Sequence, residues 1–585
     1  MKTGVVPGRV TRQGYALLMT LFFIGVALLI FSSTLTWTSS SSIVTERNNA
    51  YNRAIAAAEA STEQVLSHII RDFASQSYNP MALGVYRNLI PTNEWASQYV
   101  FDDGEGGVDL TWVDSSVGMV MTNLDSQFAG LYGFVYTCRV RSNARQVGSA
   151  FTEAAAAVRQ DFQLASIPVF QFAIFYSLDL EVNPGPSMRI TGKVHGNRDI
   201  YTSPGSSLVY EDTVGAVGKI YHHRHPDDPT SPSGIQPVYE DLRVEGDSSL
   251  TLPIGVSNSP SAVMQILDPP PFGEDPRSPL GRQRYHNKAD LIIHATATNT
   301  LLVLFNSSGD GTSYSVVPDA SLRTGTNYTF IATNSTYYDY RERKSVVGTE
   351  IDVGKFRRWM ETNSVGLNLV SQKGRALNSL YVKDGRSVSG RLTAVRLVNG
   401  QTLPANGLTV ATPHPLYVRG HYNASDLTPG SANTANTRPA SLIADAITIQ
   451  SGNWSDTYNS GTLFSSRTAA NTTVNAAFLA GIVQTTNSAG SKKYSGGVEN
   501  FPRFLENWGD RTFTYNGSMV VLFPSRYATA FWVAPGSAGG VYGAPNRRWA
   551  FDTNFLTMNK LPPLTPQLQK LVRGQWMVVA ADSPN

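Results

Sequence analysis

The 585-residue sequence predicts a mainly β protein that begins with one long helix. Three observations predict this fold class. Residues 14–45 contain no charged side chain and continue into an amphipathic pattern that ends at Phe73. A 20-residue repeat covers residues 179–218, and short apolar runs separated by Gly, Asn, Ser and Thr fill much of the later chain. We therefore expect a membrane-spanning helix, a small β-rich head and a parallel β-solenoid-like body with insertions.

The N-terminal pattern indicates one continuous helix. Residues 15–31 are almost unbroken apolar, and the Ser/Thr-rich continuation to Trp37 completes a stretch that can cross a bilayer core, which takes roughly 20 helical residues. Apolar or small residues then recur in steps of three and four, as on one helical face. These positions are Ile43 and Val44, Ala50 and Tyr51, Ala54 and Ile55, Ala58, Ser61 and Thr62, Val65 and Leu66, Ile69 and Ile70, and Phe73. No Pro interrupts residues 14–73; the alternative is a signal anchor followed by a separate core helix.

The flank before this helix indicates its orientation. It carries Lys2, Arg9 and Arg12 and no acidic residue, so the positive-inside rule keeps it cytoplasmic and places the rest of the chain across the membrane. A secretory signal peptide would have a small-x-small cleavage site after its apolar core, and none is evident there. The small residue lies before the core instead, at Gly14.

A basic leader ending in Gly14, an aromatic Tyr15, an apolar helix and a polar helical half resemble a type IV pilin-like precursor. The later run RNNAYNRAIAAAEAS is similar to the helix of minor pilins. The resemblance implies cleavage between Gly14 and Tyr15 by a prepilin peptidase at the bacterial inner membrane, with the body in the periplasm or on the cell surface. It also implies that the helix packs against other pilin or pseudopilin subunits. The helix residues we expect to contribute are Met19, Gly25, Ala58 and Glu59.

Met19 is where the chain departs from the family pattern. Major pilins carry Glu at the fifth mature position, and that Glu neutralises the terminal amine of a neighbouring subunit. Met19 at this position resembles the large minor pseudopilin of type II secretion and some minor pilins, which sit at or near a tip. The resemblance therefore implies a minor subunit, not the repeating one.

Composition excludes some classes of function. The net charge is +3 with 16% charged residues, which gives no general electrostatic footprint for nucleic acid. Cys138 is the only cysteine, so no intramolecular disulfide can form. An exported protein without disulfides depends on its core, which favours a large β architecture.

Residues 76–165 are expected to form the small α+β head. Segments 104–113 and 132–145 have strand patterns, and residues 150–164 read as a strand or, alternatively, a short helix. A strand pair packed on the amphipathic half of the helix would make a pilin-like head.

The 20-residue repeat suits one coil of a parallel β-solenoid, because stacked coils together bury a face that one coil cannot. The alternatives are chance similarity or a meander of hairpins. Matching pairs include Leu180 with Ile200, Pro184 with Pro204, Gly185 with Gly205, Met188 with Leu208, and Val194 with Val214. Inward-facing residues should include Leu180, Ile190, Val194, Ile200, Val209 or Tyr210, and Val214. Further rungs are expected at residues 291–294, 301–305, 416–422, 442–449, 476–483 and 518–523.

Two later segments have distinct patterns. Residues 353–362 predict a helix with Phe356, Trp359 and Met360 on one face. The aromatic stretch 496–576, in which Phe501, Phe504, Leu505 and Trp508 have helical spacing, is interpreted as a cap on the solenoid, with a binding surface as the alternative. The expected divisions are a leader at 1–14, the helix at 15–75, the head at 76–165, the solenoid start at 166–260, an insertion region at 261–410, and further rungs with the cap at 411–585.

Motifs for catalysis are scarce. His222, His223 and His225 lie on one short loop, which is interpreted as solvated and not as a metal site, and no HExxH, Walker A, GxSxG or EF-hand pattern occurs. We expect no cofactor and no enzymatic activity. The alternatives are a membrane-anchored carbohydrate-active enzyme with a solenoid groove, and an anchored adhesin or scaffold outside any filament; a surface or polysaccharide ligand fits either role. The layout of the body also resembles large uncharacterised bacterial envelope proteins, a resemblance that implies no activity.

Overall fold

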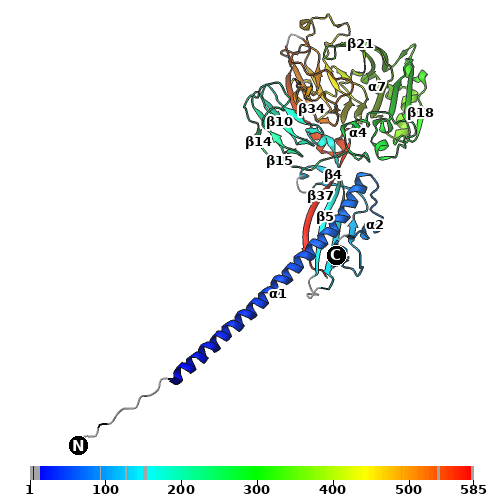
Figure 1. Cartoon of the computed structure of the whole chain (residues 1–585). Coiled ribbons are helices and arrows are strands. Elements are labelled where there is room, and N and C mark those ends of the chain that lie inside the picture. Colours follow the sequence, from blue (N-terminus) through cyan, green and yellow to red (C-terminus); the bar gives the residue numbers. More distant parts are fainter. Residues whose placement is uncertain are drawn as a thin grey trace.

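The computed structural model describes residues 4, 13–92, 94–124, 128–148, 155–298, 300–488, 490–536 and 540–581. Helix α1 (Gln13–Ala74) extends as a shaft, and its C-terminal half packs against a small sheet (Figure 1). A much larger β-rich body lies beyond that sheet. The predicted combination of a long N-terminal helix and a mainly β body is confirmed.

Helix α1 is continuous over 62 residues, which corresponds to a length of roughly 90 Å. The alternative of a separate anchor and core helix is therefore wrong, because no Pro or other break lies at the boundary between its two halves. Residues 15–49 are exposed except for the half-buried Val26, and from Ala50 onward one face of the helix is buried.

The small sheet is antiparallel, with β4 paired to β5 and β5 to β37. Strands β1, β2 and β3 follow one another along the other edge of β4. The strands are β1 (Tyr99–Asp102), β2 (Trp112–Ser115), β3 (Val120–Asn123), β4 (Tyr132–Gln146), β5 (Ala155–Pro168) and β37 (Gln567–Val579), with the short helices α2 (Gly84–Arg87) and α3 (Glu94–Gln98) beside them. Because residues 155–168 form a strand, the short-helix alternative is wrong for them.

Strand β37 changes the expected division of the chain. It pairs with β5 from Gln567 opposite Pro168 to Val579 opposite Ala157. Residues 169–566 are thus inserted between two neighbouring strands of the small sheet. The expectation that 411–585 consists of rungs and a cap is wrong at its end, since the last strand returns to the head.

The repeat forms a first stack of parallel coils. Ile200 lies between Leu180 and Ile220 in adjacent strands, and Val194 lies opposite Val214, so the 20-residue spacing is the coil register. The strands are β6 (Ile174–Tyr176), β7 (Leu180–Val182), β8 (Met188–Ile190), β9 (Val194–Gly196), β10 (Ile200–Thr202), β11 (Leu208–Tyr210), β12 (Val214–Ala216), β13 (Ile220–Tyr221), β14 (Val238–Tyr239) and β15 (Arg243–Glu245). Parallel stacking is confirmed and the hairpin alternative is wrong. The buried core includes the predicted Leu180, Ile190, Val194, Ile200, Tyr210 and Val214.

The chain then passes through α4 (Pro260–Met264), α5 (Pro279–Gln283) and α6 (Tyr285–Lys288) and starts a second stack at the far end of the body. One face of this stack has successive parallel strands β16 (Leu291–Ala295), β23 (Ser379–Asp384), β25 (Leu408–Ala411), β27 (Ala440–Ala444), β30 (Ala477–Ala480) and β35 (Met519–Val521). A second face has β22 (Lys344–Asp352), β24 (Leu392–Val398), β26 (Leu416–Arg419), β28 (Ile447–Gln450) and β33 (Arg503–Phe504), and a third has β29 (Thr472–Asn475), β34 (Thr512–Gly517) and β36 (Asn546–Phe551). Edge strands and short hairpins complete the sheets: β17 (Leu301–Asn306), β18 (Tyr314–Val316), β19 (Arg323–Thr324), β20 (Asn327–Tyr328), β21 (Ile331–Asp339), β31 (Thr486–Ser488) and β32 (Ser491–Lys493).

Residues 261–410 are more regular than expected. They contribute the rungs β16, β22, β23, β24 and β25, so the interpretation of this region as an insertion is wrong for those strands. The predicted rung at 301–305 is antiparallel to β16 and is not a rung. Helix α7 (Val353–Thr362) has the predicted bounds, its Phe356, Trp359 and Met360 are buried, and α8 (Ser364–Lys373) follows it.

The two stacks meet at strand β6, which pairs in parallel with β9 on one side and with β35 on the other. We call this junction, between the coil of residues 174–190 and the coil of residues 498–551, the seam. Phe504, Trp508 and Tyr515 are buried in the core of the coil beside the seam and not on a helix. The interpretation of the aromatic stretch as a terminal cap is wrong, because the second stack runs back toward β6 and its last coil lies inside the body.

Candidate functional site

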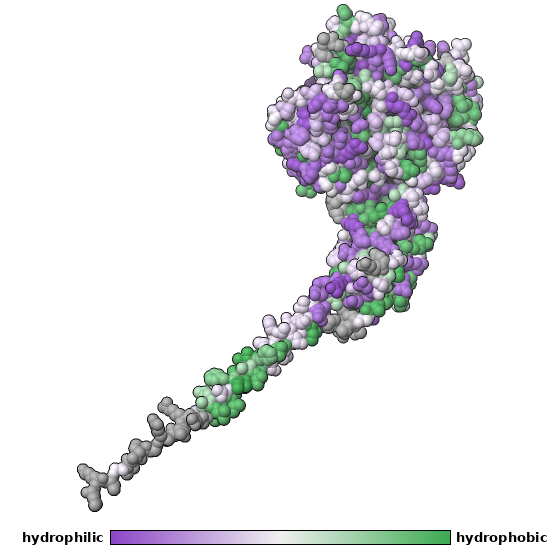
Figure 2. All heavy atoms as spheres, viewed as in Figure 1, coloured by the Kyte–Doolittle hydropathy of each residue, from purple (hydrophilic) through white to green (hydrophobic). Residues whose placement is uncertain are grey.

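The exposed half of α1 is the first candidate site. It has the length and hydropathy to cross a membrane, and a green apolar band marks it on the shaft (Figure 2). Threonine hydroxyls in this half bond within the helix: Thr20 donates to the Ala16 carbonyl at 3.0 Å, and Thr36 to the Ser32 carbonyl at 2.8 Å. Such bonds let a Ser/Thr-rich helix enter lipid, where an unpaired polar group costs several kcal/mol.

The predicted site residues on this half have free surface. The Tyr15 side chain is 81% exposed and Met19 is 58% exposed. A Cβ atom added at Gly25 would meet only open space, so another helix can approach there closely. Gly14 lies in the first turn of α1; its surroundings and most of the leader at 1–14 lie outside the described residues.

Ala58 has a different role from the one expected. Ala54, Ala57 and Ala58 are fully buried against the small sheet of the same chain, where Ala144 and Ala156 are among their neighbours. Small side chains on both surfaces allow the helix and sheet to lie close together. Ala58 is thus left with no surface for a neighbouring subunit, while Glu59 is half-buried beside it.

Strand β37 holds the helix to the sheet through a polar cluster. Arg573 donates from Nη1 and Nη2 to the Glu63 carboxylate at 2.5 and 2.8 Å. Gln160 on β5 donates to Thr62 Oγ1 at 2.9 Å and to Glu63 Oε1 at 3.0 Å. Hydrogen bonding to Arg573 lowers the pKa of Glu63. Sequence reasoning missed Arg573, since no local pattern connects it with a helix some 500 positions earlier.

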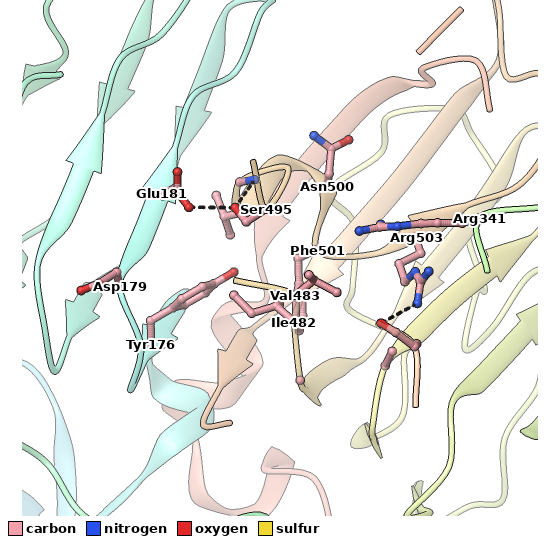
Figure 3. A pocket seen from close by; sticks show the side chains of 15 residues that line it. Tyr176, Asp179, Glu181, Arg341, Ile482, Val483, Ser495, Asn500, Phe501 and Arg503 are labelled. Carbon is pink, nitrogen blue, oxygen red and sulfur yellow. Dashed lines mark hydrogen bonds between the residues drawn. The ribbon is translucent and has the colours of Figure 1, made fainter. Parts of the chain in front are cut away.

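A second candidate site is a small cavity at the seam (Figure 3). Glu181 on β7 accepts hydrogen bonds from Thr485 and, at 2.9 Å, from Ser495, both in the second stack. Its other oxygen, Oε2, is buried and has no partner among the described residues. Glu499 accepts from Tyr494 OH at 3.1 Å and from the Asn183 amide at 3.3 Å.

Burial raises the pKa of both Glu181 and Glu499 to about 7. On the opposite side of the cavity, burial lowers the pKa of Arg341 to about 9. Glycoside hydrolysis needs two carboxyl groups on either side of a bound sugar. The cavity volume is about 20 Å³, room for about one water molecule and not for a saccharide. The arrangement therefore fits a polar joint between the stacks.

The histidine loop packs on the outer coil. Its insertion lengthens the third coil, so that Val209 pairs with Val238 and not with residue 229. His225 contacts the Tyr201 ring edge-on at 4.8 Å, and Arg224 donates to Asp228 at 2.7 Å. Among the described residues, no group of three or more His, Cys, Asp or Glu side chains is placed to hold a metal ion.

Comparisons with known proteins add little to these observations. No family model matches the sequence, and no curated protein matches it. Among solved structures, the chain is similar to the crystal structure of the competence-associated pilin ComZ from Thermus thermophilus, with 11% identity, coverage of 90% of this chain and 97% of that chain, and a TM-score of 0.26. A TM-score this low does not establish a shared fold.

Proposed function

We propose that this chain is a minor pilin-like structural subunit of a type IV pilus or a type II secretion-like assembly. In this role the exposed half of α1 is anchored in the bacterial inner membrane and packs with other pilin or pseudopilin subunits. The β-solenoid body projects into the periplasm or from the cell surface and serves adhesion or assembly, without an enzymatic role.

One observation carries the proposal: a single rigid helix combines an exposed, charge-free half with a half buried on an antiparallel sheet. An ordinary anchor needs only the first half. Because the helix is continuous over 62 residues, the direction of the membrane segment relative to the head is fixed. A subunit that packs against its neighbours through its helix needs this fixed direction, whereas a domain that is only tethered to the membrane does not. The Glu63–Arg573 ion pair and the hydrogen bonds of Gln160 support the same reading, since they tie β37 and β5, the strands at the two ends of the inserted body, to the helix.

Met19 and the size of the body favour few copies per assembly. With Met at the fifth position after Gly14, the chain has no carboxylate there to neutralise a neighbour's terminal ammonium, and an unpaired ammonium in lipid costs several kcal/mol. The inserted body of residues 169–566 would also crowd a tightly packed filament. Both features suit a tip position or low stoichiometry.

The test is the N-terminal residue of the mature protein, determined with and without a prepilin peptidase. We expect Tyr15 as the first residue when the peptidase is present. Gly14→Leu should leave an unprocessed precursor, whereas the matched leader variant Gly4→Leu should be cut normally. A mature protein that starts at Met1 or near residue 40 would contradict the proposal and favour a plain membrane anchor.

The alternative of an anchored carbohydrate-active enzyme makes a different prediction. Its carboxylates must reach substrate, yet Glu181 and Glu499 are only 5% and 6% exposed. Release of reducing ends from a polysaccharide by the wild-type chain, and its loss in Glu181→Gln, would favour that alternative over a structural role.

A further inference from the structure

An open groove lies at the seam, on the face where the two stacks do not pair. Strand β8 is the last strand of the sheet β14–β11–β8, and β36 is the last strand of the sheet β29–β34–β36. The two edges approach each other at one end, where the Phe551 amide donates to Thr191 Oγ1 at 3.0 Å, and diverge beyond it. We call the resulting space the seam groove; residues 184–189, 207 and 209 line one wall, and residues 545–550 line the other.

The seam groove has the size of a ligand site. Its volume is about 710 Å³, within the range of roughly 300–1,000 Å³ that is usual for ligand pockets. It is far larger than the cavity beside Glu181, so a chain-like ligand several units long has room in it.

The charge of the seam groove is positive. Arg548 is exposed and has no ion pair among the described residues, and Arg547 donates from Nη2 to Asn500 Oδ1 at 2.6 Å. Arg189 on the other wall is shared between Glu211 at 2.6 Å and Glu240 at 3.1 Å. Glu499, the carboxylate among the described lining residues, is buried behind the wall. Among the described lining residues, Arg548 therefore supplies cationic charge without a carboxylate partner, whereas the charge of Arg547 acts on the buried Glu499 carboxyl group.

The remaining lining residues offer a flat aromatic surface and hydrogen-bonding groups. Trp549 is half-buried in the wall between the two stacks, and Ser187, Ser207 and Asn546 are exposed along the groove. Trp549 Nε1 and Arg547 Nε are buried and have no acceptor among the described residues, so the donors that a ligand can reach are the hydroxyls and the exposed Arg548. An aromatic ring that offers an apolar face, beside hydroxyls and an exposed guanidinium group, suits a ligand with one apolar face and many oxygens.

We propose that the seam groove binds an acidic polysaccharide, a chain of sugars that carry carboxylates. A sugar ring packs its C–H face on Trp549, and its carboxylate pairs with the guanidinium of Arg547 or Arg548, a geometry that arginine forms with two parallel hydrogen bonds. This inference deepens the adhesive role in the proposed function, because it names the class of ligand that the projecting body meets.

The observations favour an acidic saccharide over nucleic acid. A nucleic acid presents a phosphate at every nucleotide, so its sites carry a row of Lys and Arg that follows the backbone. The seam groove has two arginines on one strand, of which Arg547 lies near the Glu499 carboxyl group, and Arg189 opposite them already has two carboxylate partners. Spaced carboxylates on sugars match this sparse charge better than continuous phosphates.

The experiment measures binding of the detergent-solubilised full chain to polygalacturonate oligomers by calorimetry. The comparison ligands are neutral maltoheptaose and a double-stranded DNA oligomer. We expect polygalacturonate to bind, maltoheptaose to bind at least tenfold more weakly, and added salt to weaken the interaction. Arg548→Ala should weaken binding of polygalacturonate at least tenfold, whereas Arg391→Ala, an exposed arginine outside the groove, should leave it unchanged.

Each contrary result has a definite meaning. Absence of polygalacturonate binding, equal binding of maltoheptaose, or equal loss in both arginine variants would overturn the proposal. Tighter binding of DNA, lost in Arg548→Ala, would replace the saccharide with a nucleic acid. The measurement needs no assembled filament, so failure here leaves the N-terminal cleavage test of the pilin-like role unaffected.

Discussion

The register of the first stack can be tested at Ile200. This side chain is fully buried and lies between Leu180 and Ile220 in neighbouring parallel strands, so its packing depends on three successive coils being stacked. Ile200→Ala removes three carbons. At about 0.8 kcal/mol for each buried carbon, the transfer term alone is about 2.4 kcal/mol, and a rigid cavity can raise the cost to about 5 kcal/mol.

Amide hydrogen exchange measured by mass spectrometry on the full-length chain gives this cost coil by coil. Since about 1.4 kcal/mol is a factor of ten, the amides in β7, β10 and β13 should exchange about 50-fold faster or more in Ile200→Ala. Exchange in the second stack, for example in β24, should change less. Val238→Ala is the matched control, because Val238 is 52% exposed in the outer coil and should shift stability by less than about 0.5 kcal/mol.

Equal effects of Ile200→Ala and Val238→Ala would contradict the burial of Ile200 between stacked coils. Faster exchange confined to β10 would contradict it as well, since a stacked ladder transmits the loss to both neighbouring strands.

Three further predictions follow from the described contacts. Ala58→Leu should overpack the helix against the small sheet and destabilise their packing by about 1–3 kcal/mol, which should appear as faster proteolysis between residues 50 and 74. Tyr51→Leu is the control and should not speed proteolysis, because the Tyr51 side chain is 40% exposed. Equal protease resistance of the two variants would contradict the burial of Ala58. Between pH 6.5 and 8 the thermal stability of the body should fall as pH rises, because the pKa values of Glu181 and Glu499 are raised by burial from 4.5 to about 7, so the folded chain holds protons that the unfolded chain has released. The half-buried His294 and the buried His414 have pKa values lowered from 6.5 to about 4, so they act in the opposite direction up to about pH 7.5. The test is therefore a comparison by calorimetry: from pH 6.5 to 8, a Glu181→Gln and Glu499→Gln double variant should lose less stability than the wild-type chain. Met19→Glu should raise the number of copies per filament, quantified against the major subunit, without changing the melting temperature of the body, because Met19 is 58% exposed and lies in the exposed half of α1. An unchanged copy number would show that the fifth position does not control stoichiometry.

Local spacing in the sequence was sufficient for several elements. The charge-free run, the steps of three and four and the absence of Pro specify one helix through Phe73, and the structure has that helix. The 20-residue spacing of residues such as Leu180 and Ile200 became the register of parallel strands, because every coil of a solenoid must place its inward side chains at the same position. The apolar face of residues 353–362 likewise predicted α7 with its observed bounds.

The candidate sites were less accessible to sequence reasoning. Ala58 is small enough to allow close packing of the helix, but the sequence does not show whether the helix packs there on another subunit or on the sheet of its own chain. The seam groove joins residues 184–189 to residues 545–550, and Glu181 accepts from Thr485 across the seam. Neither wall carries a motif, so no local signal connected them.

The helix, the coil register of the first stack and the predominance of strands could all be predicted from the sequence, since each depends on periodic side chains within one segment. Three features are visible only in the folded chain: β37 returns to β5, the second stack runs back toward β6, and Arg573 binds Glu63. This is because the alternation of apolar and polar side chains along a strand is the same whichever strand it pairs with. Which backbone edge it pairs with depends on the edges that remain free once the rest of the chain has folded.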